Sequence, residues 1–319
     1  RSPVFQMISV NLSRLSIMRS FRDGTLQNFI TGRVVSPAIY EQRLRRFRRE
    51  LNQLAQFGRR QNIPMLWYVP AASESGFQPN HSWVLPGTST DEKHELTQIW
   101  NEANRFSQQE DWIAVVERCR KGLLRQPQFA DFHFLLGECL LRLNQPQEAQ
   151  KHFVQALDND GHPIRMNHDY RRAIEQVAEV FDIVTVKSEV VLRPHTPQGI
   201  LDHSVIHDNV HPTFRGFFWL GLAGADQVFR SKLLAATFGD PQSLRDVTEM
   251  DAAQKFGIEA SDVAVACRRI ANGLRWLSRL RFDSERRLKD ADEFEEWARR
   301  IEAEEVRPGE RSIESLESF

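Results

Sequence analysis

The stretch Ile206-His207-Asp208-Asn209-Val210-His211-Pro212-Thr213-Phe214-Arg215-Gly216 decides how the rest of the chain is interpreted. It places an acid three residues before a histidine, where extended sequence gives way to a helical pattern. Pro212 biases the residue before it toward extended backbone and is itself favourable in the first turn of a helix. We therefore expect His211 on a loop at the mouth of a helix, with Asp208 close enough to hold one ring nitrogen.

Two units of helix followed by strand precede this loop. In the first, Ser36 and Pro37 form a helix start signal, and an apolar stripe with helical spacing runs on to Phe57. The apolar run 65–69 follows and predicts a buried strand. In the second unit a helical stripe over 170–181 leads to the β-branched run 183–186. We expect both strands in one doubly wound parallel sheet, with ligands bound at its carboxyl edge.

A helical segment with an internal repeat, residues 91–161, separates the two units. Its small and large apolar residues recur at spacings similar to those of tetratricopeptide repeats. The better-matching unit contains Leu136, Gly137, Leu140, Ala149, Phe153 and Ala156, and the copy before it contains Ala103, Phe106, Val115, Cys119, Gly122 and Pro127. Since fewer than about three repeats seldom bury a core alone, the module is expected to be an insertion that packs against its neighbours.

Only helices are predicted beyond Gly224. Ser261 is expected to cap a long apolar-striped helix, and a charged helix spans roughly Asp283 to Glu304. The chain is thus predicted to consist of the first part of an α/β domain (1–90), the helical insertion (91–161), the second part of the α/β domain (162–224), a helical extension (225–306) and a disordered tail (307–319).

Composition excludes several classes of function. Lys+Arg 42 against Asp+Glu 43 gives a formal net charge of -1, so the general positive field of a nucleic-acid binder is absent. The three cysteines show neither metal-ligand spacing nor a disulfide framework and are interpreted as small buried apolar residues. No apolar run approaches the length needed to span a membrane, and no signal peptide opens the sequence. We expect a soluble chain without a cofactor.

The pairing of Asp208 with His211, followed by Pro212 and by a glycine before an apolar helix, resembles the last sequence block of the SGNH (GDSL) hydrolases. The order of the elements over roughly residues 36 to 224 is similar to that of a bacterial group in which tetratricopeptide repeats are embedded in such a hydrolase. The resemblance implies a partial SGNH-like α/β fold and a serine esterase or acyl hydrolase. It also implies an ester or acylated substrate, with His211 as general base and Asp208 as its orienting partner.

Two parts of the family pattern are not found in this chain. The resemblance implies a nucleophilic serine in a Gly-Asp-Ser block, and no serine in residues 1–35 has such neighbours. Because the chain begins with Arg1, we expect that block upstream and expect the given chain alone to be inactive. Relatives commonly place an oxyanion-donating asparagine after the first strand, where Ala71, Ala72 and Ser73 stand here; Asn80 lies nearby, and the sequence does not fix its register. Many relatives also carry an N-terminal membrane anchor, so the location of the full-length protein is left open.

Three alternatives compete with catalysis. The acid and histidine could simply cap the following helix. His203, His207 and His211 recur at every fourth position and would cluster as metal ligands on a helix, but Pro212 argues against a helix there, so no metal is expected. Finally, the chain could be a decayed hydrolase scaffold whose tetratricopeptide module binds a protein or peptide partner.

Overall fold

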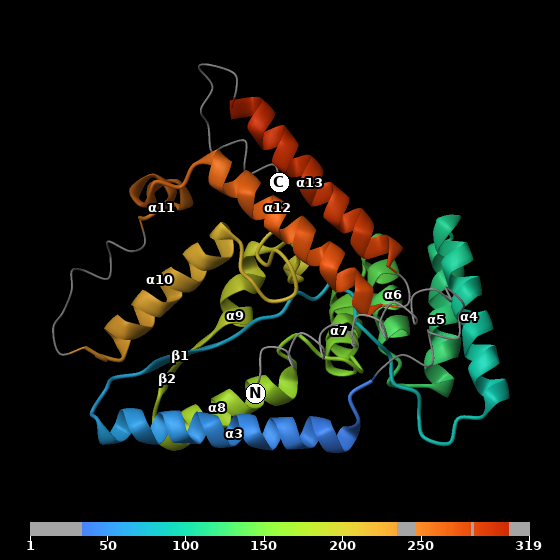
Figure 1. The fold of residues 1–319 in the computed structure, drawn as a ribbon, viewed down its shortest axis with the longest axis horizontal. Helices are drawn as coiled ribbons and strands as arrows, with labels where there is room; N and C mark the ends of the chain where they lie inside the picture. Colours follow the sequence, from blue (N-terminus) through green and yellow to red (C-terminus); the bar gives the residue numbers. More distant parts are fainter. Residues whose placement is uncertain (1–33, 235–245, 282–283, 306–319) are drawn as a thin grey trace, which may run out of the picture.

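The computed structural model describes residues 34–234, 246–281 and 284–305. Within these ranges the chain is mostly helical and contains a small parallel sheet (Figure 1). The elements are α3 (Pro37–Arg60), β1 (Leu66–Val69), α4 (Thr90–Gln108), α5 (Trp112–Arg125), α6 (Ala130–Arg142), α7 (Pro146–Asp158), α8 (His168–Phe181), β2 (Val184–Lys187), α9 (Ser188–Leu192), α10 (Phe214–Arg230), α11 (Glu249–Phe256), α12 (Ala260–Leu277) and α13 (Glu285–Glu305), with 3-10 turns at Arg193–His195, Pro197–Gly199 and Ser278–Leu280. The predicted tail, 307–319, lies outside the described residues.

The two predicted helix–strand units share one sheet. β1 and β2 pair in parallel, with Leu66 opposite Val184 and Val69 opposite Lys187. A parallel pair requires a long crossover, and here the crossover contains the helical segment α4 to α8. The described residues contain only this pair of strands in the sheet, so the larger doubly wound sheet stays a prediction.

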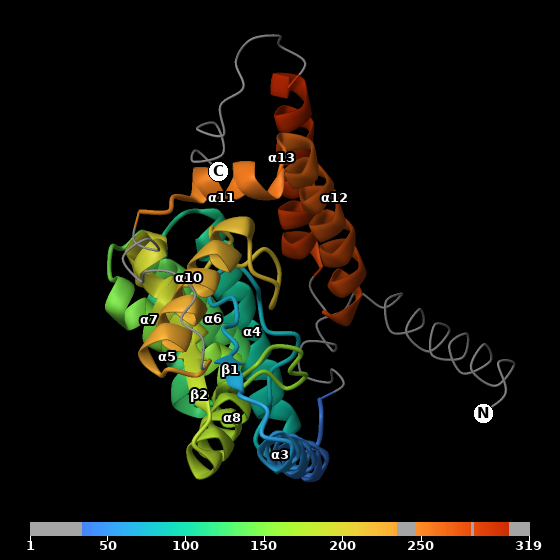
Figure 2. The ribbon, with the colours of Figure 1, turned by 90° about the vertical axis from the view of Figure 1, so that its left-hand side faces the viewer.

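Helices cover both faces of the sheet (Figures 1 and 2). On one face α3 and α8 pack in a cluster that includes Ala55, Val177 and Ile183. On the other face the Tyr68 hydroxyl donates to the Leu220 carbonyl of α10 at 3.2 Å. The start of α3 is as predicted, because Pro37 is its first residue and the Ser36 hydroxyl accepts from the backbone N–H of Ile39. Because β1 and β2 are parallel, their carboxyl ends lie at the same edge of this helix–sheet–helix arrangement.

Consecutive helices from α4 to α7 pack around one apolar core. Two glycines of the predicted repeat allow this close packing, since a Cβ at residue 122 would lie 2.5 Å from the Phe132 ring and one at residue 137 would lie 2.9 Å from the Phe153 ring. The core is completed by Ile200, which belongs to the segment after β2. The four helices α4 to α7 therefore share their core with a segment outside them.

The C-terminal helices α12 and α13 form a hairpin with its own apolar cluster, and Phe77 from the loop after β1 inserts into that cluster. The prediction that Ser261 caps the first of these helices is wrong. The helix begins at Ala260, and Glu259 occupies the cap position. The Asp262 carboxylate accepts from the backbone N–H of Glu259 at 3.0 Å, so an acid within the first turn supplies the terminal hydrogen bond.

All three cysteines are buried and unbonded, in agreement with the sequence-based interpretation. In the described part of the chain, no helix is both long enough and apolar enough to cross a membrane.

Gly216 is required by a close approach between α10 and the preceding loop. A Cβ at this position would lie 2.3 Å from the Val205 carbonyl oxygen, and that backbone atom cannot move aside. We expect Gly216→Ala to lower the free energy of unfolding by about 1 to 3 kcal/mol. Gly221→Ala in the same helix is the control, because its Cβ would meet open space, and it should stabilise the protein by about 0.5 to 1 kcal/mol. Urea unfolding of both variants measures the difference, and equal effects would contradict the steric argument.

Candidate active site

The loop before α10 is held in a narrow turn by its own backbone. The N–H of His207 donates to the carbonyl of His211 at 2.9 Å, and the N–H of Thr213 donates to the carbonyl of Val205 at 2.9 Å. The Thr213 hydroxyl then accepts from the N–H of Gly216 at 3.0 Å and caps α10. His211 therefore lies on a loop at the mouth of a helix, as its position before a proline predicted.

Asp208 binds His211 through both oxygens of its carboxylate. Oδ1 accepts from the backbone N–H groups of Val210 at 2.8 Å and His211 at 2.9 Å, and Oδ2 lies 2.8 Å from His211 Nδ1. Burial by itself raises the pKa of Asp208, but these hydrogen bonds outweigh it and hold the pKa below its ordinary value. Because an ionised carboxylate can only accept, Nδ1 carries the proton and Nε2 is left as the basic nitrogen.

The two side chains of the pair differ in exposure. The His211 side chain is 74% exposed, whereas the Asp208 side chain is 20% exposed. The carboxylate is therefore shielded and fixed, while the ring that it orients is open to a reacting group.

The loop after β1 contacts this loop directly. The N–H of Ser73, four residues beyond the last residue of β1, donates to the carbonyl of Asn209 at 3.3 Å. The contact places the loop that carries His211 beside the loop that leaves the carboxyl end of β1.

Asn80 does not replace the oxyanion-donating asparagine of the family pattern. It is fully buried, its N–H donates to the carboxylate of Asp160 at 3.0 Å, and its side-chain amide donates to the His162 carbonyl at 2.8 Å. These contacts give Asn80 a structural role within the loop. Ala71 and Ala72 have no donor in their side chains, and the hydroxyl of Ser73 is buried.

Two of the histidines that recur at every fourth position have a ring nitrogen hydrogen-bonded within the loop. His203 Nδ1 lies 2.8 Å from the carbonyl of His207, and His211 is bound to Asp208. His207 is mostly buried, and that burial lowers its pKa to about 4. In the described ranges no group of three or more His, Cys, Asp or Glu side chains is arranged to hold a metal ion.

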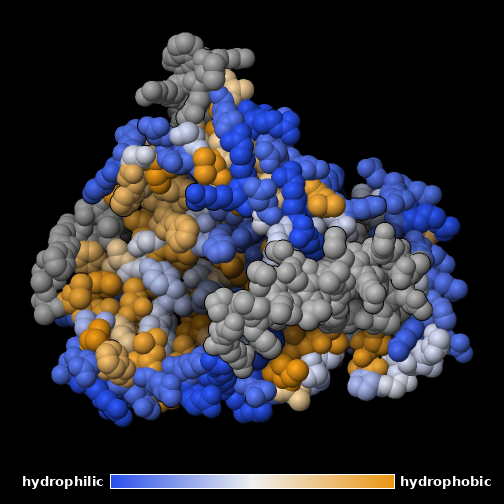
Figure 3. All heavy atoms as spheres, in the orientation of Figure 1, coloured by the Kyte–Doolittle hydropathy of each residue, from blue (hydrophilic) through white to orange (hydrophobic). Residues whose placement is uncertain are grey.

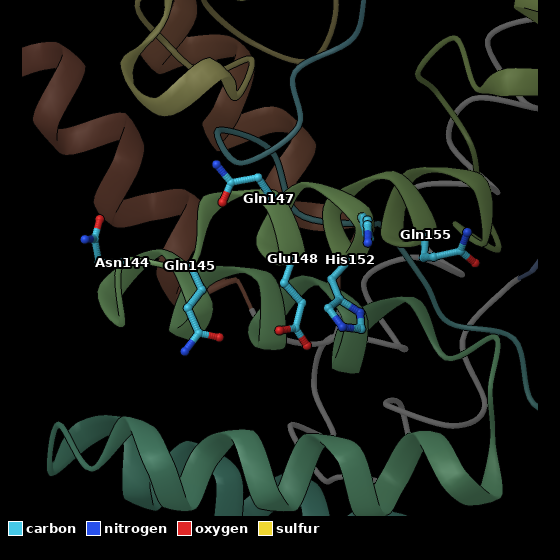
Figure 4. Close-up of a pocket in the computed structure, with 7 residues that line it drawn as sticks. Asn144, Gln145, Gln147, Glu148, His152 and Gln155 are labelled. Carbon is cyan, nitrogen blue, oxygen red and sulfur yellow. The ribbon is translucent and has the colours of Figure 1, made fainter.

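A second surface feature lies on the helical module. The turn before α7 and the exposed side of α7 line a hollow of about 620 Å³ (Figure 4). Most of its side chains are amides, and Glu148 and His152 lie one helical turn apart within it. His152 Nδ1 is 2.9 Å from His133 Nδ1, and His133 Nε2 is 2.8 Å from the Pro127 carbonyl. The hollow is open to solvent and is lined mainly by residues with polar side chains.

Sequence reasoning missed two side chains that connect the loops of the candidate site, Glu74 and Arg193. Glu74 stands in a serine-rich loop and Arg193 in a proline-rich one, and neither belongs to a motif. They form a bidentate ion pair with N–O distances of 2.8 and 3.0 Å. No pattern in the sequence around either residue could have identified this ion pair.

Comparisons of this chain with models of protein families, with curated proteins and with solved structures found no match.

Proposed function

We propose that this chain forms the C-terminal part of a serine esterase or acyl hydrolase of the SGNH type. The observation that carries the proposal is the Asp208–His211 pair, with Nδ1 bound at 2.8 Å to a shielded carboxylate on a ring that is open to solvent. His211 Nε2 would take the proton from a serine as that serine attacks the ester carbonyl, and would return it to the leaving alcohol. Asp208 would keep the reactive tautomer and stabilise the imidazolium.

The surface beside the pair supports an acylated substrate. α10 begins three residues after His211, and Phe217 in its first turns is 61% exposed. Figure 3 shows apolar surface over the region of this helix. An acyl chain could be bound there by burial of apolar area, which contributes roughly 25 cal/mol per Å².

The proposal is tested on the protein extended upstream to include a Gly-Asp-Ser block. His211→Ala is expected to lower kcat for a short-chain p-nitrophenyl ester by about 10³- to 10⁴-fold, and Asp208→Asn by a comparable factor, because the base or its tautomer is lost. His94→Ala, an exposed histidine on α4, is the matched control and should hydrolyse the ester at the wild-type rate. Equal rates for His211→Ala and wild type would exclude the mechanism.

A second function, binding of a protein or peptide partner by the four-helix module, is supported by the open hollow on α7. The neighbouring helix α6 is almost wholly buried by the chain itself, so α7 offers the more accessible surface for such a partner. An upstream sequence without a Gly-Asp-Ser block would favour this function over hydrolysis.

A further inference from the structure

The carboxylate of Glu74 is buried in the loop that follows β1. The residue is 3% exposed, and its carboxylate accepts from both terminal nitrogens of Arg193, at 3.0 and 2.8 Å, and from the backbone N–H of Leu201 at 3.0 Å. A buried carboxylate is costly unless such donors compensate it, and a bidentate guanidinium provides both charge and a fixed geometry. The three bonds tie the loop after β1 to the segment that leads to the acid–histidine loop.

The backbone of the same loop makes three further contacts with that segment. The N–H groups of Glu74 and Ser75 both donate to the Leu201 carbonyl, at 2.7 and 3.2 Å, and the N–H of Ser73 donates to the Asn209 carbonyl at 3.3 Å. Residues 73–75 thus hold the segment 201–209 at both of its ends. Asp208 lies at the second end, directly before Asn209, and His211 follows two residues after Asn209.

The other side of the loop is fixed by Arg165. This arginine has a side chain that is 1% exposed, and it donates to the carbonyls of Ser73 at 2.9 Å and Phe77 at 2.7 Å. Because Arg165 fixes the loop after β1 in this way, the loop would stay in place if the segment 201–209 moved. Any loosening of the contact with Leu201 therefore appears as movement of the segment 201–209 relative to the sheet.

Leu201 is connected to the candidate site by backbone hydrogen bonds and by the short stretches of chain between them. The next residue, Asp202, accepts at its carbonyl from the N–H of Ile206 at 2.9 Å, and the Val205 carbonyl accepts from Thr213 at 2.9 Å. Thr213 is the cap of α10 and stands two residues after His211. The position of Leu201 therefore sets the base of the turn that carries the histidine.

We propose that Glu74 is a positioning residue, whose carboxylate holds the Asp208–His211 loop against the carboxyl end of β1. Its relevance to catalysis rests on the proposed hydrolase function, whereas its effect on the loop does not. Arg193 is its partner in this role and also donates to the Gly199 carbonyl at 2.7 Å. Neither residue touches the reacting atoms.

The test compares Glu74→Gln with wild type by NMR, in protein labelled with ¹⁵N in its histidine rings and backbone. We expect amide exchange at Ser73 to become at least about tenfold faster and the His211 ring to lose its single Nδ1–H tautomer, at temperatures where circular dichroism shows the chain still folded. Glu74→Asp, which keeps the charge, should retain the tautomer. Glu50→Gln, which removes an exposed carboxylate paired with Arg46 on α3, is the matched control and should change neither signal.

If Glu74→Gln does not fold, the same measurements can be made on a second variant. Arg193→Lys keeps the charge but loses the guanidinium fork, and this side chain is partly exposed, so folding should survive. It should show the same two changes to a smaller degree. Unchanged Ser73 exchange together with an unchanged His211 tautomer, in whichever variant folds, would overturn the inference.

The outcomes separate this inference from the proposed function. In the intact hydrolase, Glu74→Gln should lower kcat by about tenfold or more with little change in KM, because binding of the ester does not depend on the tautomer. If His211→Ala left ester hydrolysis intact while Glu74→Gln still altered the ring signals, the hydrolase proposal would fail and the positioning role would stand. If His211→Ala abolished hydrolysis and Glu74→Gln changed nothing, the hydrolase proposal would stand and the positioning role of Glu74 would fail.

Discussion

Replacing Arg281 with methionine is expected to lower the free energy of unfolding by about 3 to 5 kcal/mol, the cost of leaving a buried charge without its partner. The Arg281 and Asp131 side chains are 1% and 2% exposed, and a guanidinium nitrogen lies 2.9 Å from the carboxylate. Arg281 also donates to the Pro79 carbonyl. Methionine fills much of the volume but leaves the Asp131 carboxylate without its cation.

The effect is large because the pair joins three separate parts of the chain. Asp131 lies in the first turn of α6, and its second oxygen accepts from the Ser82 hydroxyl at 2.6 Å. Pro79 and Ser82 belong to the loop after β1, while Arg281 follows α12. Loss of the cation therefore loosens the C-terminal hairpin, the helical module and that loop together.

Urea unfolding followed by circular dichroism measures the change, with Arg279→Met, Asp131→Asn and the double variant for comparison. Arg279→Met alters an exposed arginine in the 3-10 turn that directly precedes Arg281 and should change stability by no more than about 0.5 kcal/mol. The double variant Arg281→Met, Asp131→Asn should be more stable than Arg281→Met alone, since it leaves no ionised group unpaired. Strict additivity of the two single changes would contradict a direct charge interaction.

The features that could be predicted from sequence are those whose causes lie within a few residues. Ser36 and Pro37 mark a helix start by themselves, and Asp208 reaches His211 because three residues of turn bring the two side chains together. Both were predicted and both are present. The wrong prediction of a cap at Ser261 also has a local cause, because the carboxylate of Asp262 accepts the hydrogen bond from the backbone N–H at the start of that helix.

The features that could not be predicted are long-range pairs. Glu74 and Arg193 lie 119 positions apart, and Asp131 and Arg281 lie 150 apart. Each charged side chain is ordinary in its own segment, and a single sequence carries no record of which one meets which. The sheet shows the same limit, because a short apolar run predicts a strand but not how many strands pair with it.

Acidification from pH 7.5 to 5 is expected to destabilise the protein through three half-buried histidines. Burial lowers the pKa of His81, of His152 and of His207 to about 4 in each case, against an ordinary value of 6.5. The unfolded chain therefore binds protons below pH 6.5 that the folded chain does not bind. The stability contributed by the neutral rings is complete above pH 6.5 and is lost as the pH falls toward 4.

The loss of stability depends on how many more protons the unfolded chain binds than the folded chain does. With allowance for partial exposure of these rings, each should contribute about 1 kcal/mol of destabilisation at pH 5. Urea unfolding at pH 7.5, 6.5, 5.5 and 5.0 gives the slope of stability against pH, which reports the protons taken up on unfolding. His207→Gln should reduce that slope by up to one proton, while His94→Gln, at an exposed position on α4, should leave it unchanged. A slope of zero over this range would mean that the three rings are solvated in the folded protein, because only solvation would let them titrate as they do in the unfolded chain.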